Sequence, residues 1–228
     1  MKSPDQSTVV LFPGMGADAR MFDGLREEFP RLVVPDWPDV DDRPSLRAFA
    51  GRVAERLSAA GLASPEMVLG GASFGGMVAL EVAKIVKPRA VVLIGSCRHP
   101  SAIPRRLAWL EWLCRPIPTS LLDHLKFLGR AGDHGLGPMD DSHRRLLAEM
   151  MRDVPMRFVA WSSRAIFEWP GCPDPGVSVL HVHGRLDGMI LSSRVVPDVW
   201  IDGAGHVPSM THPADVGAII RRACRLDP

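Results

Sequence analysis

The chain has 228 residues, 46% of them hydrophobic, and its 27 lysines and arginines nearly balance its 26 acidic residues. This length and composition suit one globular domain with a full-sized core. The balanced charge argues against a nucleic-acid-binding protein, which concentrates positive charge on one face. No apolar run approaches the roughly 18 residues of a membrane span, and the first residues lack the segments of a signal peptide. We therefore expect a cytoplasmic protein that binds a small molecule.

Six short apolar runs alternate with helical patterns along the chain. The runs cover residues 8–12, 32–35, 67–69, 90–94, 177–183 and 195–201. Several show little polar alternation, which is typical of strands that are covered on both faces. Apolar residues repeat at helical spacing after Ser45, over residues 74–86 and after Pro213. This alternation predicts an α/β fold with a mostly parallel six-stranded sheet and helices on both faces.

The alternation breaks between residues 104 and 170, where no run resembles a strand. Four helical segments are predicted there, over residues 107–114, 120–128, 142–151 and 156–167. We expect residues 104–170 to form a helical cap inserted into a single domain that spans residues 1–228. Three tryptophans of the insertion are predicted either to line an apolar substrate pocket or to pack the cap onto the core: Trp109, Trp112 and Trp161. Trp169 lies at the end of the same segment.

The most specific motif is Gly71-Ala72-Ser73-Phe74-Gly75, which lies between a predicted strand and a predicted helix. A Gly-x-Ser-x-Gly pattern in this context is typical of a nucleophile elbow. The turn is so tight that side chains at Gly71 and Gly75 would collide with neighbouring backbone. The serine is held in a strained conformation that exposes its hydroxyl. The motif therefore predicts Ser73 as a catalytic nucleophile.

A serine hydroxyl is a weak nucleophile unless a base takes its proton. His206 is the best placed of the eight histidines, because it follows the last predicted strand in the glycine-rich sequence Gly203-Ala204-Gly205-His206. We predict that His206 is the base. His181 and His183 fall in the fifth strand, where we expect packed or hydrogen-bonded core groups.

The base needs a carboxylate that fixes its tautomer. Asp187 follows the fifth predicted strand by a few residues and is the predicted acid. Asp202 is closer to His206 in sequence but would have to fold back sharply, and Asp198 is expected within a strand. The order of serine, aspartate and histidine along the chain differs from both protease orders.

The developing oxyanion needs preorganised N–H donors. One predicted donor is the backbone amide of Phe74, directly after the nucleophile. The other is the amide of Met15, because the glycines on either side of it, Gly14 and Gly16, allow close approach to a ligand. The Met15 side chain is also predicted to form one wall of the substrate pocket.

Together these motifs resemble the α/β-hydrolase superfamily over residues 9–224, close to the whole chain. The size and the cap are similar to those of small carboxylesterases of the pimeloyl-carrier-protein methyl esterase type. The resemblance implies a serine carboxylesterase acting on small or medium apolar esters, without a metal ion or cofactor. One departure is Pro13, at a position where many relatives have histidine.

Other interpretations stay open on the sequence. Thioesterases, acyltransferases, perhydrolases and small-molecule receptors share the same fold and triad. A nicotinamide-dependent oxidoreductase is a weaker alternative, because Gly14-x-Gly16-x-x-Ala19 and Asp36 match the letters and spacing of a dinucleotide fingerprint. That alternative leaves the motifs around Ser73 and His206 unexplained.

Overall fold

The protein is described from a computed structural model that covers residues 7–42, 45–107 and 133–226. Its centre is a six-stranded sheet in the order β2-β1-β3-β4-β5-β6, and every neighbouring pair is parallel. The strands are β1 (Val9–Phe12), β2 (Leu32–Val33), β3 (Val68–Ala72), β4 (Ala90–Ile94), β5 (Ser178–Gly184) and β6 (Val199–Ile201). The α/β fold class and the six-stranded, mostly parallel sheet predicted from the sequence are confirmed.

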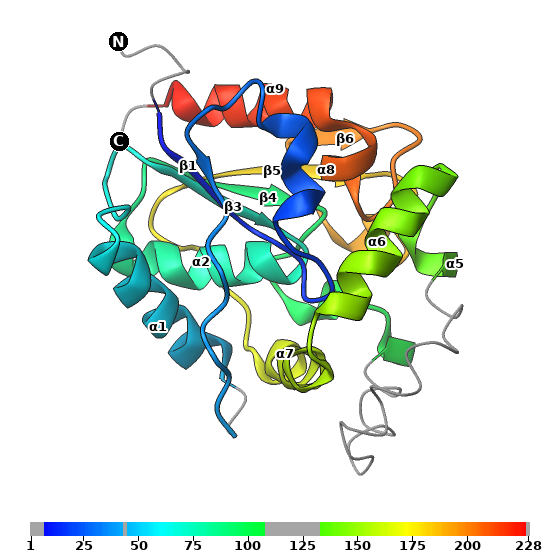
Figure 1. The fold of residues 1–228 in the computed structure, drawn as a ribbon, viewed down its shortest axis with the longest axis horizontal. Helices are drawn as coiled ribbons and strands as arrows, with labels where there is room; N and C mark the ends of the chain where they lie inside the picture. Colours follow the sequence, from blue (N-terminus) through cyan, green and yellow to red (C-terminus); the bar gives the residue numbers. More distant parts are fainter. Residues whose placement is uncertain (1–6, 43–44, 108–132, 227–228) are drawn as a thin grey trace.

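Helices cover both faces of the sheet (Figure 1). One face carries α1 (Leu46–Ala59) and α2 (Phe74–Val86), and the other carries η2 (Ala19–Leu25), α8 (Pro208–Thr211) and α9 (Pro213–Cys224). The side chains of alternate strand residues divide between two apolar clusters, so that Val10 and Phe12 pack with α1 and α2, and Val9 and Leu11 pack with α9. All four of these side chains are fully buried, as expected for strands between two helical layers.

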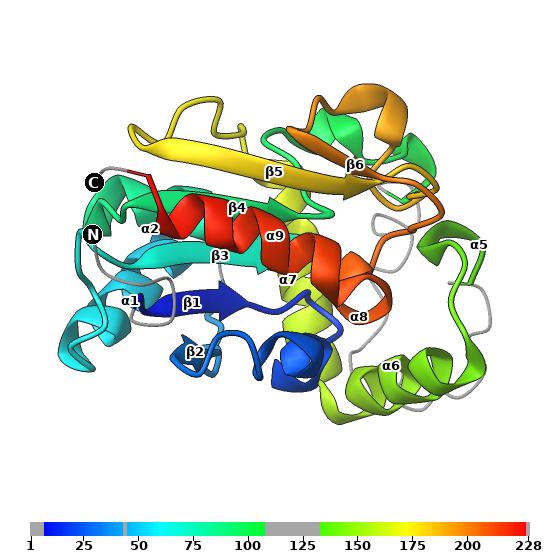
Figure 2. The same ribbon diagram turned by 90° about the horizontal axis from the view of Figure 1, so that it is seen from above.

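Of three helices of the insertion, the first two lie beyond the carboxyl ends of the strands, and the third lies on the side of the sheet that carries α1 and α2 (Figure 1 and Figure 2). They are α5 (Asp133–Leu136), α6 (Asp141–Asp153) and α7 (Met156–Glu168). Two short 3-10 helices are η3 (Pro100–Ala102), which follows β4, and η5 (Ser192–Arg194), which follows β5. The described part of residues 104–170 contains no strand. Two predicted helices correspond to α6 and α7, and the other two, at 107–114 and 120–128, lie outside the described residues except for Leu107.

The insertion is tied to both halves of the core. Leu147 and Met150 of α6 belong to the cluster on the α9 side of the sheet, whereas Phe158 of α7 belongs to the cluster on the α1 side. Arg20 of η2 also pairs with Asp153 at the end of α6, with Nη2 and Oδ2 2.6 Å apart. The helices therefore share the core of the sheet domain.

The strand order reverses its direction of winding between β1 and β3. The chain runs from β1 outward to β2 on one side and continues with β3 on the other side. Ligands of parallel α/β sheets bind outside the carboxyl ends of the strands at such a reversal. The loops after β1 and β3 contain Met15 and Ser73.

Among the described residues, none of the helices combines the length and the apolar character that crossing a membrane requires.

Candidate active site

Ser73 occupies the strained turn between β3 and α2. Its backbone has φ 51° and ψ −120°, in a region that side-chain-bearing residues rarely adopt. A Cβ on Gly71 would collide with the carbonyl of Gly75, and a Cβ on Gly75 would collide with the carbonyl oxygen of Phe12. Only glycine fits at both positions, which explains the motif.

Hydrogen bonds from β4 and the loop after it hold the strained turn. The Ser73 N–H donates to the carbonyl of Ile94 at 3.0 Å, and the Ser96 hydroxyl donates to the carbonyl of Ser73 at 2.7 Å. Ser96 is fully buried. Because both backbone groups of Ser73 have partners, its side chain keeps a fixed direction at the edge of the sheet.

The side chains of His206 and Asp187 lie next to Ser73 at the carboxyl end of the sheet. The His206 Nε2 lies 2.9 Å from the Ser73 Oγ, and its Nδ1 lies 2.8 Å from the Asp187 Oδ2. Both His206 and Asp187 are buried, at 8% and 4% exposure. With Nδ1–H donating to the carboxylate, Nε2 is free to accept the hydroxyl proton. Ser73 and His206 are 133 positions apart in the sequence, and Asp187 and His206 are 19 positions apart. The loops after β3, β5 and β6 bring the three residues together.

The Asp187 carboxylate is charged despite its burial. Burial alone would raise the pKa of Asp187, but attraction to His206 and hydrogen bonds to the carboxylate lower that pKa below its ordinary value. Oδ1 accepts the backbone N–H groups of Met189 at 2.8 Å and Ile190 at 2.9 Å. A carboxylate with these partners has a fixed plane and direction.

The two alternative acids have other partners. Asp202 pairs with Arg185, with Oδ1 and Nε 2.5 Å apart, and its side chain is 88% exposed. Asp198 precedes β6 instead of lying within it, and its Oδ2 accepts the backbone N–H of His181 at 2.8 Å. The position of Asp198 was therefore predicted wrongly. The first residue of β6 that pairs with β5 is Val199, which lies opposite Val182.

The loop after β1 lies beside the Ser73 side chain. A Cβ on Gly14 would lie 3.8 Å from the Ser73 Cβ, which is ordinary van der Waals contact. Within residues 7–42, 45–107 and 133–226, the Met15 N–H has no hydrogen-bond acceptor. Phe74 is the first residue of α2, where helix geometry leaves the N–H without an intrahelical partner. Both predicted oxyanion donors thus come from backbone next to Ser73.

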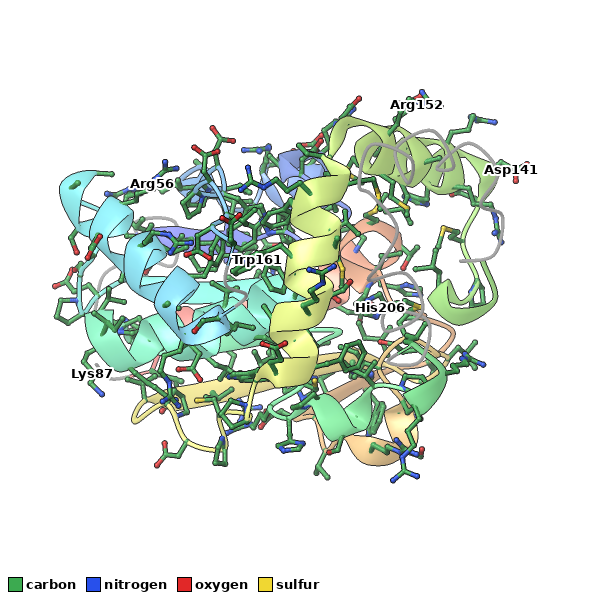
Figure 3. All side chains as sticks on the ribbon, turned by 90° about the horizontal axis from the view of Figure 1, so that it is seen from below. Arg56, Lys87, Asp141, Arg152, Trp161 and His206 are labelled. Atoms are coloured by element: carbon green, nitrogen blue, oxygen red, sulfur yellow. The ribbon has the colours of Figure 1, made fainter. Side chains whose placement is uncertain are left out.

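The tryptophans that were predicted to line the pocket are placed less directly against the site. Trp161 is 5% exposed and packs on Phe49 of α1 with ring centroids 4.8 Å apart. Figure 3 shows Trp161 on the side of α7 toward α1, and His206 beyond the other side of α7. The indole N–H of Trp169 donates to the buried Glu81 at 2.8 Å. Trp109 and Trp112 lie outside the described residues.

Two helices of the insertion contact the Met15 loop instead. A Cβ on Gly16 would lie 3.3 Å from the Cγ of Met151 on α6. The Ser163 hydroxyl on α7 lies 3.6 Å from the Met15 sulfur. The sequence provided no specific sign of either contact, because each joins residues that are more than 100 positions apart.

A short helix of the insertion also holds the two loops that carry Asp187 and His206. The carbonyl of Gly135 accepts the Gly188 N–H at 2.9 Å, and the carbonyl of Leu136 accepts the His206 N–H at 2.8 Å. Neither Gly135 nor Leu136 was predicted, since α5 has only four residues and carries no apolar period.

The described residues contain no group of three or more histidine, cysteine, aspartate or glutamate side chains arranged to hold a metal ion. Three cysteines in this part of the chain are free and buried: Cys97, Cys172 and Cys224. Burial raises the pKa of the Cys97 thiol to about 12, so this thiol is protonated at neutral pH. The fourth, Cys114, lies outside the described residues.

The chain belongs to the alpha/beta hydrolase family, whose sequence profile matches residues 9–219. Comparison with curated protein sequences finds no significant match. This membership and the 3-10 turns of η2 argue against a dinucleotide site, which requires an α-helix after the Gly14–Gly16 loop.

Solved structures with similar folds include several esterases. An esterase from Thermogutta terrifontis is 22% identical with a TM-score of 0.72, and the match covers 98% of this chain and 91% of that one. MenH from S. aureus is 14% identical with a TM-score of 0.73, over 98% and 94% of the two chains. The esterase EaEST from Exiguobacterium antarcticum is 14% identical with a TM-score of 0.71, over 99% and 93%. At these identities the likeness shows the fold.

Proposed function

We propose that this hydrolase-family protein is a serine carboxylesterase with Ser73 as nucleophile, His206 as general base and Asp187 as the acid that orients the base. The observation that carries this proposal is the continuous chain of hydrogen bonds from Asp187 through His206 to the Ser73 hydroxyl, at 2.8 and 2.9 Å. This series of hydrogen bonds ends at Ser73, whose backbone is strained and which lies at the carboxyl end of the sheet, where α/β proteins bind ligands.

The first step forms an acyl-enzyme. His206 Nε2 takes the Ser73 proton while Oγ attacks the ester carbonyl carbon, and the carbonyl oxygen becomes an oxyanion. The amides of Met15 and Phe74 donate hydrogen bonds to this oxyanion, and the positive N-terminal end of α2 also favours its charge. The bond to the alcohol then breaks as His206 gives its proton to the leaving oxygen.

The second step releases the acid. A water molecule takes the place of the alcohol, gives a proton to His206 and attacks the acyl carbon. Collapse of the new oxyanion breaks the bond to Ser73 Oγ, which recovers its proton from His206. Asp187 stays ionised throughout and stabilises the imidazolium that forms twice in each turnover. This reaction calls for no metal ion or organic cofactor.

For the substrate we propose a small or medium apolar ester beneath a cap formed by residues 104–170. Support comes from the contacts of Met151 and Ser163 with the Met15 loop, because they place α6 and α7 against the predicted oxyanion hole. Thioether and other apolar groups in this region suit an acyl chain better than a sugar. Met15 serves as both donor and pocket wall in this proposal.

The test is a panel of p-nitrophenyl esters of graded acyl length, together with matching thioesters, assayed with the wild type and with Ser73→Ala. We expect the wild type to hydrolyse short and medium esters, and Ser73→Ala to lose several powers of ten in kcat. Ser58→Ala, which removes a hydroxyl from α1 far from the triad in sequence, is the control for protein quality. Wild-type turnover in the Ser73→Ala variant would contradict the proposal.

A further inference from the structure

The amide that precedes the predicted oxyanion donor Met15 has a sulfur acceptor. The backbone N–H of Gly14 donates a hydrogen bond to the Sδ of Met21, with nitrogen and sulfur 3.5 Å apart, and this bond is buried. Because Pro13 has no N–H, Gly14 carries the first amide hydrogen of the loop that follows β1. The Met21 side chain therefore binds the backbone of this loop one residue before Met15.

The carbonyl group of Gly14 is also held. Its oxygen accepts the N–H of Ala17 at 3.2 Å, which closes a turn over the loop. The peptide bond between Gly14 and Met15 is planar and trans, so the Met15 N–H points away from the Gly14 carbonyl oxygen. In the part of the chain that the structure describes, the Met15 N–H has no acceptor of its own. Its direction is therefore determined by the two hydrogen bonds of Gly14.

The sulfur of Met21 belongs to an element that is itself fixed. The helix η2 begins after Asp18, whose carboxylate accepts the backbone N–H of Arg20 at 2.9 Å. Met21 is 3% exposed and packs in the apolar cluster on the α9 side of the sheet. A Cβ on Gly24 would lie 2.9 Å from the Cβ of Pro213, so η2 packs tightly against the start of α9. The acceptor thus keeps a constant position relative to the sheet.

A thioether suits the chemistry of this acceptor position. Its sulfur accepts a hydrogen bond and has no hydrogen to donate, so it pairs one buried N–H and leaves no other polar atom without a partner. An asparagine or glutamine would bring two N–H donors that need partners in a buried place. A carboxylate would place a negative charge beside a loop that has to stabilise an oxyanion. Methionine avoids both costs.

We propose that Met21 is a positioning residue of the oxyanion hole, and that its Sδ holds the Gly14 N–H so that the Met15 N–H points toward the oxygen of the reacting carbonyl. Met21 acts through the backbone of Gly14. The inference rests on the proposed function, because the direction of the Met15 N–H affects catalysis only if this amide stabilises an oxyanion.

The experiment replaces Met21 by leucine, which is similar in volume and has no acceptor atom. Met21→Ile is a second variant without sulfur, should the leucine variant fail to fold. Met210→Leu is the matched control, because Met210 is buried in the same apolar cluster and, among the described residues, its sulfur accepts no hydrogen bond. Circular dichroism and thermal unfolding establish which variants fold.

We expect Met21→Leu to lower kcat for a p-nitrophenyl ester by about three- to tenfold, the factor that corresponds to one hydrogen bond of ordinary strength. KM should stay within about twofold, since an oxyanion donor acts mainly in the transition state. The affinity for a trifluoromethyl ketone, which forms an oxyanion when Ser73 adds to it, should fall by the same factor as kcat/KM. Met210→Leu should keep all three values within about twofold of wild type.

The hydrogen bond itself is measured without substrate, by amide hydrogen exchange in ¹⁵N-labelled protein. We expect the Gly14 N–H to exchange at least about fivefold faster in Met21→Leu than in wild type, after correction for the amides of β4, which report any general loss of stability. In Met210→Leu the corrected exchange of the Gly14 N–H should equal that of wild type.

A folded Met21→Leu or Met21→Ile variant with wild-type kcat and wild-type affinity for the ketone would overturn the inference. Equal losses of kcat in Met21→Leu and Met210→Leu would overturn it too, since they would indicate only core packing. A wild type that hydrolyses no ester and binds no ketone contradicts the proposed function, whereas unchanged exchange of the Gly14 N–H in Met21→Leu contradicts only the role of Met21.

Discussion

The backbone N–H of His206 donates a hydrogen bond to the carbonyl of Leu136 at 2.8 Å, which joins the proposed catalytic base to the inserted helix α5. Gly205 makes this approach possible, because a Cβ at that position would collide with the same carbonyl oxygen. The insertion therefore contacts the backbone that aims the base, in addition to any contact it makes with substrate.

Gly205→Ala should separate α5 from the His206 loop. We expect kcat for a p-nitrophenyl ester to fall by about ten- to hundredfold, because small displacements of a catalytic group cost this much. Gly51→Ala is the matched control, since a Cβ at that position of α1 meets nothing within 4 Å. The control should gain about 0.5–1 kcal/mol of stability and keep its activity. Unchanged kcat in folded Gly205→Ala would contradict the importance of this contact.

Strain at Ser73 predicts that a glycine at this position is more stable than an alanine. Because Ser73 has φ 51°, a glycine there adopts the same conformation without a steric cost. Ser73→Gly should therefore unfold at a higher temperature than Ser73→Ala, with a difference of about 1 kcal/mol, while both lack activity. Differential scanning calorimetry measures the two variants. An alanine variant as stable as the glycine variant would show that the turn is not strained.

The acid is tested by a pair of matched substitutions. Asp187→Asn should be severe, since an amide cannot hold the His206 tautomer that accepts the Ser73 proton, and such a change costs about 10⁴-fold in kcat in a serine protease. Asp202→Asn removes only an exposed partner of Arg185 and should change kcat by less than about twofold. Equal effects on kcat at the two positions would mean that Asp187 is not the acid.

Much of this arrangement was predictable because its determinants are local. The elbow around Ser73 and the glycine-rich loop before His206 are contiguous motifs, and the apolar runs of β1, β4 and β5 lie between turn residues. The ends of the strands were predicted less accurately. β2 stops at Val33, close to Pro35, which cannot donate a hydrogen bond to a strand ladder, and β6 starts only at Val199.

What the sequence did not reveal depends on tertiary contact. Nothing near Gly135 or Leu136 indicates that their carbonyls meet the loops carrying Gly188 and His206. His183 left a weak sign, because a histidine within an apolar strand must find a partner when buried. That sign did not identify the carbonyl of Ile190 as the partner, since the contact depends on how the loop after β5 turns back.

The buried, neutral His181 predicts that the folded protein loses stability in acid. The pKa of His181 falls from 6.5 to about 3 on folding because of its burial, so below pH 6.5 the unfolded chain binds a proton that the folded protein does not. Stability should therefore decline as pH falls from about 6.5 towards 3, by about 3–5 kcal/mol from this residue. Urea unfolding of wild type and His181→Gln at several pH values measures this. A stability difference between them that stays constant over this range would contradict it.

Alanine substitutions of the tryptophans in residues 104–170 distinguish a role in packing from a role in substrate selection. Trp161→Ala should destabilise the protein by about 3–5 kcal/mol, since its ring is buried against Phe49. If tryptophans also line the pocket, as we predict for Trp109, Trp112 and Trp161, at least one alanine variant should change the ratio of kcat/KM between short and long esters. If all folded variants keep the wild-type length profile, these residues only pack the cap.

The most direct test of the central claim is the site of covalent labelling by a fluorophosphonate, located by peptide mapping in the mass spectrometer. Reaction requires a serine that is activated by a base and faces an oxyanion hole, and Ser73 meets that description through its 2.9 Å contact with His206. We predict one label per chain, on Ser73, which is absent in Ser73→Ala and strongly slowed in Asp187→Asn. A label on another serine, such as Ser96 or Ser162, or no label on the folded wild type, would contradict the account.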